Sequence, residues 1–310
     1  MSLSFADLPL RPELLEAIQR IGYEEMTPIQ AQALPFILDQ KDVIGQAQTG
    51  SGKTAAFGLG LLQNVDNTVV TTQALVLCPT RELADQVAEA LRRLAHRLPN
   101  TTVTSLCGGR ASRPQQVALE RGIHVVVGTP GRISDHIRRG NLDVSGLKTL
   151  VLDEADRMLD MGFVDEVSGI VDQCPPDRQT LLFSATLPEA IETLSGATQR
   201  EPTLIRVGPA RSPADIVQHV VHCATNQRHN VVCSLLSLHQ PDSALIFCHT
   251  RQDCETLAET LYRRGASVLA LHGGMEQRDR AEVLLQFSNG SKRFLVATDV
   301  AARGLDIAEL

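Results

Sequence analysis

The sequence predicts an α/β fold of two domains, each built on a parallel β-sheet. Short runs of Val, Ile and Leu recur along the chain, and segments with helical spacing separate them, which is the alternation of a βαβ protein. The runs are almost wholly apolar, as expected for strands covered by helices on both faces. The chain has 310 residues, and a typical domain has about 100 to 200. Its length therefore suits two domains.

Composition narrows the class of protein. Apolar residues make up 43% of the chain and charged residues 21%, close to average globular usage, which disfavours disorder, collagen-like repeats and coiled coil. The net charge of −7 lacks the basic excess of a surface dominated by phosphate binding, so a nucleic-acid site would have to be a local arrangement. Seven cysteines without a CxxC pair, and no signal peptide or long apolar run, predict a cytoplasmic protein without membrane association.

The first predicted domain covers residues 1–207. After a short strand candidate at Val43 and Ile44, its clearest strands are Ala74 to Cys78, Ile123 to Val127, Thr149 to Leu152 and Thr180 to Phe183. Arg81 to Arg97 lies between two of these strands and places Leu83, Val87 and Leu91 on one face, which predicts an amphipathic crossover helix.

The second predicted domain covers residues 208–310 and begins at the segment GPARSP. Two prolines and a glycine within this segment, residues 208–213, predict a linker. The alternation of strands and helices then resumes. The predicted strands are 244–248, 268–271 and 294–297, and the predicted helices are 252–264 and 277–287.

A phosphate-binding loop is predicted at AQTGSGKT, residues 47–54, between the first strand and a helical pattern. Glycines let backbone N–H groups converge on phosphate oxygens at a helix N-terminus. Lys53 is expected to reach the β and γ phosphates and Thr54 to bind Mg²⁺. The predicted loop contacts to the nucleotide are Ala47, Gln48, Thr49, Gly50, Ser51 and Gly52, with Ala47 standing where the strict pattern has glycine. A turn that only caps a helix is the alternative, and the Lys-Thr pair disfavours it.

An acidic element follows a later strand, in TLVLDEAD at residues 149–156. Asp153 is predicted to bind Mg²⁺, and Glu154 is predicted to orient or deprotonate an attacking water. Alone, these carboxylates could equally be an acidic helix cap. With the phosphate loop upstream, they predict hydrolysis of a nucleotide.

The tetrapeptide Asp153 to Asp156 resembles the signature of DEAD-box ATP-dependent RNA helicases, and the resemblance extends from Phe5 to Leu310. It implies two RecA-like lobes with ATP and Mg²⁺ as cofactors. The segment GYEEMTPIQ at 22–30 is similar to the family's Q motif, so Gln30 would read the adenine edge and Tyr23 would stack on its ring. The ATP contacts that the resemblance adds are Phe5, Tyr23, Thr27, Gln30 and Asp306.

Further segments resemble the family's RNA-binding and coupling elements. PTREL at 79–83, the glycine pair 108–109 and TPGR at 129–132 match RNA contacts of the first lobe, and segments at 245–250, 272–280 and 297–307 match the second. The RNA contacts that this implies are Arg81, Gly108, Gly109, Thr129, Gly131, Arg132, Arg251, Gly273, Gln277, Arg280 and Thr298. The segment SAT would couple hydrolysis to strand separation through Ser184 and Thr186.

The resemblance predicts a monomer that unwinds short RNA duplexes as its lobes close on ATP and RNA. It is strongest to a bacterial group within the family that acts on ribosomal RNA. Met26, His249 and Gly274 depart from usual family residues. The family continues past this chain's last residue to an arginine-rich segment that acts on the γ phosphate. The expectation is therefore a partial second lobe, and the alternative function is a nucleotide-dependent RNA-binding module with little turnover. A DNA translocase is disfavoured by Gln30 and TPGR.

One group of His and Cys residues falls outside these elements: His219, His222, Cys223, His229 and Cys233. Zinc sites use such residues, but this spacing matches no common finger pattern. The segment IVQHVVHC at 216–223 alternates in polarity, which predicts an edge strand followed by the start of a helix.

Overall fold

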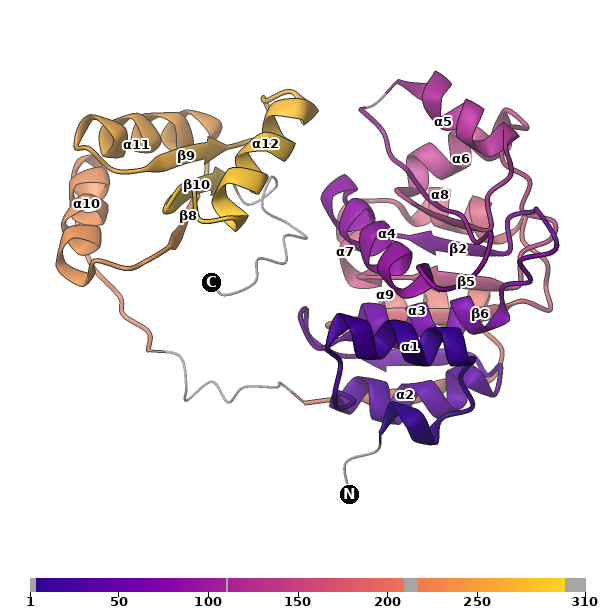
Figure 1. Ribbon diagram of the computed structural model, residues 1–310. Coiled ribbons are helices and arrows are strands. Elements are labelled where there is room, and N and C mark those ends of the chain that lie inside the picture. Colours follow the sequence, from indigo (N-terminus) through magenta and orange to yellow (C-terminus); the bar gives the residue numbers. More distant parts are fainter. Residues whose placement is uncertain (1–3, 110, 209–216, 299–310) are drawn as a thin grey trace. The chain divides into compact units, whose positions relative to one another are not determined.

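The computed structural model describes residues 4–109, 111–208 and 217–298, and the chain divides into two compact units, Met1–Ser212 and Pro213–Leu310 (Figure 1). The predicted linker at 208–213 lies outside the described residues except for Gly208. No helix within the described ranges is long and apolar enough to cross a membrane.

A parallel sheet forms the centre of the first unit, with its seven described strands in the order β3-β4-β2-β5-β6-β1-β7. The strands are β1 (Val43–Gln46), β2 (Ala74–Leu77), β3 (Val103–Leu106), β4 (Val125–Gly128), β5 (Thr149–Leu152), β6 (Gln179–Ser184) and β7 (Thr203–Arg206). The strands predicted from apolar runs are confirmed as β1, β2, β4, β5 and β6.

Helices cover both faces of this sheet. They are a short 3₁₀ helix (Phe5–Asp7), α1 (Pro12–Ile21), α2 (Pro28–Leu38), α3 (Lys53–Asn64), α4 (Arg81–Ala95), α5 (Ser112–Glu120), α6 (Pro130–Arg138), α7 (Ala155–Asp160), α8 (Val164–Val171) and α9 (Glu189–Thr198). Proline at the first position starts α1, α2 and α6, where its missing N–H costs nothing. The Thr80 hydroxyl accepts a hydrogen bond from the Leu83 N–H at 3.2 Å and caps α4, the predicted crossover helix.

The first unit has two apolar cores, one on each face of the sheet, because successive side chains along a strand point to opposite faces. Val76, Val151 and Phe183 face one core, which α1, α2, α3 and α4 close, and Phe57 packs on Phe183 with ring centroids 5.5 Å apart. The opposite face carries Leu75 and similar residues, which pack against α6, α7, α8 and α9. Because helices bury both faces of the sheet, the packing of the side chains on each face fixes the register of the strands. The strand ends therefore keep fixed positions relative to one another.

A smaller parallel sheet, in the order β8-β10-β9 for its described strands, forms the second unit. Its elements are a 3₁₀ turn (Thr225–Gln227), α10 (Arg228–His239), β8 (Ala244–Cys248), α11 (Arg251–Arg263), β9 (Val268–Leu271), α12 (Gln277–Ser288) and β10 (Phe294–Thr298). Leu257 and Leu261 of α11 pack on Val296, and Phe287 packs on Leu295 across the sheet. The predicted α/β fold with parallel sheets is confirmed.

The prediction of an edge strand at 216–223 is wrong for residues 217–223, which have no regular secondary structure. Val217 and Val220 are 80% and 83% exposed. A strand needs a neighbour to bond its N–H and C=O groups, and no described strand pairs with this segment. The predicted helix start is confirmed, since α10 begins at Arg228.

Of the His and Cys group, His229 and Cys233 lie in α10, while His219 stacks on His239 with centroids 6.5 Å apart.

Candidate functional site

The carboxyl ends of the first unit's strands lie side by side at one edge of the sheet. The register pairs Leu106 with Gly128, Gly128 with Leu77, and Leu77 with Leu152. Because all strands are parallel, the loops that follow them emerge at this same edge, where open α/β sheets bind ligands. The loops after β3, β4 and β2 carry the predicted RNA contacts, and those after β5, β6 and β1 carry the predicted nucleotide contacts. The strand order therefore divides the edge into two halves.

Residues 47–52 form the loop between β1 and α3. Gly50 and Gly52 have φ of +76° and +92°, which glycine adopts readily. The N–H of Ala47, a buried residue, donates to the carbonyl of Ser184 at 3.0 Å, so the alanine at this position fits the apolar core beneath the loop. Lys53 begins α3, and the loop thus ends at a helix N-terminus, where backbone N–H groups and the helix dipole favour anions.

Three buried polar atoms beside this loop have no hydrogen-bond partner among the described residues. They are the Lys53 Nζ, the Ser51 Oγ and the Thr27 Oγ1. Buried polar groups are normally paired, and an unpaired buried ammonium is costly. All three atoms donate hydrogen bonds, so phosphate oxygens would satisfy them. Thr54 lies next to Lys53 in the first turn of α3 and is half-buried.

The acidic residues after β5 approach the same loop. The Asp153 N–H donates to the carbonyl of Leu77 at 3.0 Å, which continues the sheet's bonding into the acidic element. Glu154 has left-handed backbone angles, φ 51° and ψ 51°, an uncommon conformation for a residue with a Cβ that is often found at functional sites. Its Oε1 accepts a hydrogen bond from the Thr49 hydroxyl at 3.2 Å, and its Oε2 lies 3.4 Å from the Arg157 guanidinium.

Burial raises the pKa of Asp153 to about 6, and the opposing charge of Lys53 is outweighed by this desolvation and by the charge of Glu154. A buried carboxylate of this kind gains from a bound cation. Mg²⁺ usually takes one or two carboxylates together with substrate phosphates, so Asp153 and the Thr54 hydroxyl fit this ion without a larger acidic cluster. The described residues contain no group of three or more His, Cys, Asp or Glu that could hold a metal.

The segment after β6 is bonded to the acidic element. The Ser184 hydroxyl donates to the carbonyl of Thr186 at 2.6 Å. Thr186 in turn donates to the Asp156 Oδ2 twice, from its N–H at 3.0 Å and from its hydroxyl at 2.8 Å. Asp156 therefore joins the loop after β6 to the start of α7.

The N-terminal segment reaches the phosphate loop through Gln30. Its Oε1 accepts from the Thr27 N–H at 2.9 Å, and its Nε2 donates to the carbonyl of Gly52 at 3.1 Å. Phe5 and Tyr23 stack with centroids 6.4 Å apart, and Tyr23 is 40% exposed. A hollow of about 300 Å³ beside these rings leaves room for a flat ligand.

The predicted RNA contacts of the first unit also lie together. Arg81 begins α4, and its guanidinium lies so close to Gly109 that a Cβ there would overlap it. The loop after β4 is tied to β3 because the Thr129 N–H donates to the carbonyl of Leu106 at 3.3 Å. Gly131 and Arg132 follow Thr129 in the first turn of α6.

In the second unit the predicted contacts follow the ends of β8, β9 and β10. Cys248 pairs with Thr298 in register, and the loop after β8 leads to Arg251 at the start of α11. The guanidinium of Arg251 lies where a Cβ on Gly274 would be, so a glycine at this position gives the arginine its space. The remaining predicted contacts are Gly273 in the loop after β9, and Gln277 and Arg280 in α12. Asp306 lies outside the described residues.

Two residues of the site have roles that the sequence did not predict. Asp156 accepts hydrogen bonds from Thr186, and the Arg157 guanidinium contacts Glu154. The sequence signal for these roles is their position, because both residues lie in the first turn of the helix that directly follows Asp153 and Glu154.

Comparison with known proteins identifies two matching families. Residues 27–194 match the DEAD/DEAH box helicase family, and residues 227–310 match the helicase conserved C-terminal domain. The chain is 53% identical to the ATP-dependent RNA helicase DbpA of Escherichia coli K12, over 97% of this chain and 66% of that protein. It is 44% identical to the DEAD-box ATP-dependent RNA helicase CshA of Geobacillus kaustophilus, over 98% of this chain and 65% of that one. The chain thus spans just under two thirds of the length of these relatives.

Solved structures have the same architecture. A DEAD box protein from the hyperthermophile Methanococcus jannaschii aligns with a TM-score of 0.64 at 38% identity, covering 100% of this chain and 84% of that one. Dbp5 of Saccharomyces cerevisiae bound to RNA and ADP BeF3 aligns with a TM-score of 0.84 at 31% identity, covering 98% of this chain and 78% of that one. The two units are therefore RecA-like domains.

Proposed function

This chain belongs to the DEAD/DEAH box helicase family, and on that premise we propose that it couples ATP hydrolysis to local unwinding of RNA duplexes. The observation that carries the proposal is the buried Lys53 ammonium, which has no hydrogen-bond partner among the described residues, on a loop that contacts a buried pair of acidic residues. A site with this unpaired donor and these carboxylates is arranged for a polyphosphate and its cation.

The phosphate loop binds the ATP phosphates in this proposal. The loop residues 47–52 present backbone N–H groups, Lys53 donates to the β and γ phosphates, and Ser51 contributes its hydroxyl. Mg²⁺, held by Asp153 and Thr54, would supply positive charge to the phosphates. Gln30 is placed against the loop by its bond to Gly52 and reads the adenine edge, while Tyr23 supplies an exposed ring for stacking. Phe5 supports Tyr23, Thr27 orients Gln30, and Asp306 would contact the ribose.

Glu154 acts on the attacking water. The Thr49 hydroxyl donates to its Oε1, and its Oε2 has no hydrogen-bond partner among the described residues and lies 3.4 Å from the Arg157 guanidinium, so this oxygen can accept a proton. In this position it accepts the proton that the water loses as its oxygen bonds to the γ phosphorus, while the bond from that phosphorus to the β,γ-bridging oxygen breaks and ADP leaves.

Ser184, Thr186 and Asp156 transmit the state of the nucleotide site. Asp156 follows the catalytic pair in the chain and holds the loop after β6 through two hydrogen bonds. A shift of the acidic element on hydrolysis would therefore move this loop as well, which supports a coupling role for Ser184 and Thr186.

RNA binds along the loops after β3, β4 and β2 in the first unit and along the strand ends of the second. Arginine guanidinium groups, threonine hydroxyls and glycine backbone N–H groups suit the sugar-phosphate backbone. Contacts of this kind read little sequence, and preference for RNA over DNA would come from the 2′-hydroxyl.

The finer proposals are a structured ribosomal RNA as substrate, a cytoplasmic location and a monomeric state. The similarity to DbpA supports the bacterial branch of the family. None of the seven cysteines, all of which lie in the described part of the chain, forms a disulfide, which suits a reducing compartment.

Hydrolysis by the 310-residue chain tests the proposal most directly. ATP turnover is measured with and without single-stranded RNA, for the natural chain and for Glu154→Gln. Loss of the general base should lower the RNA-stimulated rate by about 10² or more, while ATP affinity changes little because the phosphate loop is intact. Glu189→Gln, the same substitution at an exposed helix position, is the matched control and should keep the natural rate.

Two results would contradict the proposal. ATP-dependent RNA binding without turnover in the natural chain would make it a binding module. Stimulation by duplex DNA equal to that by RNA would remove the assignment of RNA as substrate.

A further inference from the structure

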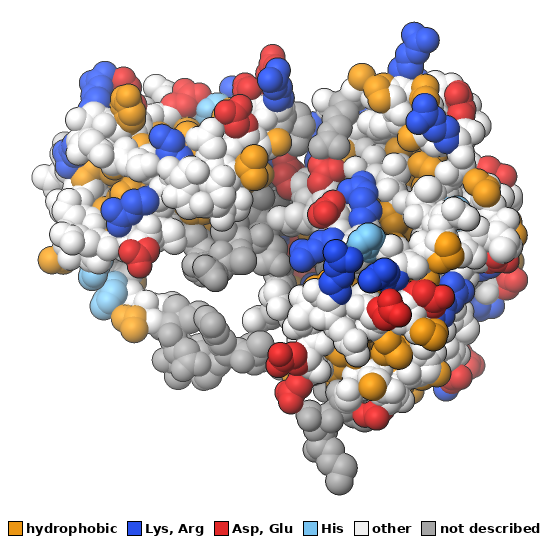
Figure 2. Space-filling view, viewed as in Figure 1, with side chains coloured by type: hydrophobic (Ala, Val, Ile, Leu, Met, Phe, Trp, Pro, Cys, Tyr) orange, Lys and Arg blue, Asp and Glu red, His pale blue; other side chains and the backbone are white. Residues whose placement is uncertain are grey.

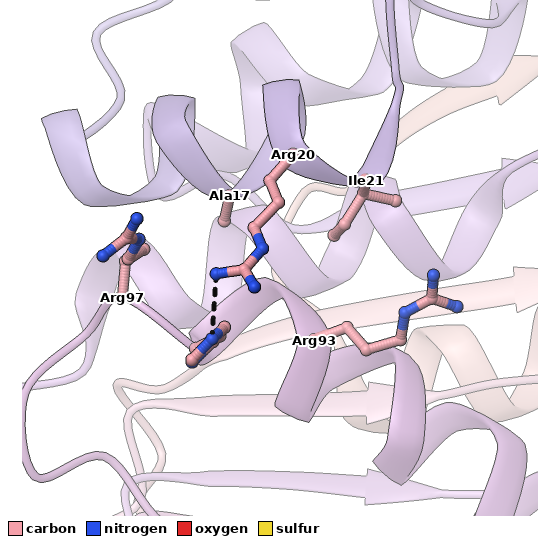
Figure 3. Close-up of a pocket in the computed structure, with 6 residues that line it drawn as sticks. Ala17, Arg20, Ile21, Arg93 and Arg97 are labelled. Carbon is pink, nitrogen blue, oxygen red and sulfur yellow. Dashed lines mark hydrogen bonds between the residues drawn. The ribbon is translucent and has the colours of Figure 1, made fainter.

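A basic hollow lies between α1 and α4, apart from the residues assigned to ATP or RNA. It measures about 180 Å³ and is lined by Ala17, Arg20, Ile21, Arg93, His96 and Arg97 (Figure 3). Figure 2 shows Lys and Arg side chains gathered around a His on this face of the first unit. Three guanidinium groups around one hollow are a concentration of positive charge in a chain whose net charge is −7.

The positive charges in this hollow are poorly compensated. The Arg93 guanidinium is exposed and has no hydrogen bond or ion pair with another described residue. Arg20 contacts His96, with its Nη1 3.2 Å from the ring Nε2. Because a guanidinium has only donors, the imidazole accepts this bond, and the charge of Arg20 meets no carboxylate.

No acidic residue is among the described residues that line the hollow, and the nearest ion pair joins one of its arginines to Glu16 outside it. Glu16 lies 3.6 Å from the Arg97 Nε, and both side chains are more than half exposed. An ion pair with this exposure is weak. An incoming anion can therefore replace Glu16 at Arg97 with little loss.

The hollow lies at the far end of α4 from the predicted RNA contacts. Arg81 begins α4 at the carboxyl edge of the sheet, and Arg93 follows 12 positions later in the same helix, about 18 Å along its axis at 1.5 Å per residue. That distance corresponds to roughly five stacked nucleotides at 3.4 Å each. A nucleic acid held at the edge reaches the hollow only if it extends beyond the segment bound there.

We propose that this hollow binds a backbone phosphate of the RNA, outside the segment held at the sheet edge. Guanidinium groups bind phosphate oxygens, and the three that line this hollow lie at separate points along it, Arg20 on α1, Arg93 on α4 and Arg97 just after α4 (Figure 3). The proposal rests on RNA being the substrate. It predicts that RNA affinity depends on length, with the gain carried by Arg20, Arg93 and Arg97.

The test compares Arg93→Gln with Arg92→Gln in the full chain. Arg92 is the next residue on α4, is also exposed, and bonds Glu89 and the carbonyl of Val103 instead of lining the hollow. Both substitutions remove one positive charge, so their difference isolates the hollow. Affinity is measured with a short RNA and with one about ten nucleotides longer, over a series of salt concentrations.

Arg93→Gln should weaken binding of the long RNA about 3- to 10-fold, since a phosphate contact is lost, and should reduce the salt slope by about 0.7. Binding of the short RNA and of ATP should stay unchanged. Equal effects of the two substitutions, or no effect of Arg93→Gln on the long RNA, would overturn the inference while leaving the proposed function intact. Failure of the natural chain to bind either RNA would instead overturn both.

Inorganic phosphate distinguishes the source of the anion. The ring signals of His96 in NMR spectra should shift with the long RNA in the natural chain and not in Arg93→Gln. A shift with phosphate alone and none with RNA would assign the hollow to a free anion and overturn the RNA assignment. Poly-glutamate is an acidic peptide and serves as a competitor for the bound long RNA. If it displaced this RNA more strongly than unlabelled RNA does, the RNA assignment would also be overturned.

Discussion

The carboxyl group of Asp153 is buried, since the residue is only 2% exposed to solvent. Burial is the main reason that its pKa rises to about 6, against 3.8 in an unfolded chain. The folded state thus holds its proton more tightly than the unfolded state does. Stability from this group is therefore present at low pH and is lost as the pH rises from about 4 to 6.

Asp153→Asn should accordingly stabilise the metal-free protein. At pH 8 the natural carboxyl is ionised, and about two pKa units correspond to roughly 3 kcal/mol of unfolding free energy. At pH 5 the gain should be about half as large, because the natural carboxyl is then mostly protonated in the fold. Urea unfolding in the presence of EDTA measures both values. The same variant should lose Mg²⁺-dependent ATP binding.

Asp165→Asn, at an exposed position in α8, is the control and should leave unfolding unchanged at both pH values. A destabilised Asp153→Asn at pH 8 would mean that the carboxylate is better compensated than its burial indicates.

The positions of the candidate nucleotide-site residues in the fold could be predicted because each stands beside a strand or in a glycine loop, while their roles stay predictions. Lys53, Asp153 and Glu154 are examples. The bond from Gln30 to Gly52 and the bond from Thr186 to Asp156 could not be predicted, since they join positions 22 and 30 residues apart through side-chain geometry. Local patterns carry no information on such pairings.

At the scale of elements, apolar runs identified the interior strands of the first sheet and missed its two outer strands. The outer strands β3 and β7 read VTSL and TLIR, with polar or exposed positions, because one side of each has no strand neighbour in the described sheet. The opposite error occurred at 217–223, where alternation predicted a strand that the described part of the second unit does not pair. A strand depends on its partner, and a single segment does not reveal one.

Asp156 in α7 accepts two hydrogen bonds from Thr186 in the loop after β6, and Asp156→Asn tests the importance of this connection. Replacing one carboxylate oxygen by an amide removes an acceptor for the two donors of Thr186, which should cost about 1 kcal/mol of stability. RNA-stimulated hydrolysis and duplex unwinding should fall, while ATP affinity stays within about twofold, since the phosphate loop is untouched.

Asp160→Asn, exposed on the same helix, should behave as the natural protein. A double-mutant cycle with Thr186→Val completes the test. Additive effects of Asp156→Asn and Thr186→Val would show that the two residues do not act as a unit.

For the whole molecule, the small number of arginines among the predicted RNA contacts predicts a weak dependence of RNA binding on salt. The predicted contacts include four arginines, Arg81, Arg132, Arg251 and Arg280. At about −0.7 per phosphate of a single strand, they give a slope of about −3 for the logarithm of affinity against the logarithm of salt concentration. This slope is measured by titrating a short RNA at salt concentrations from about 50 to 200 mM, the range in which phosphate contacts are usually compared.

A slope steeper than about −6 would mean that many further cations meet the phosphates. A slope near zero would mean that these arginines do not reach the backbone. Either value would remove the assigned contacts as the main source of RNA affinity.

The strand order β3-β4-β2-β5-β6-β1-β7 has a consequence for how such proteins can diversify. The loops after β3, β4 and β2 lie on one side of the β2–β5 boundary and can change in sequence or length without changing the length of the loops after β5, β6 and β1. Under the proposed function, new RNA preferences would arise through inherited changes in three loops, while the loops proposed to bind ATP are passed on unaltered. One sheet thus carries a variable set of loops and a constant set of loops along the same edge.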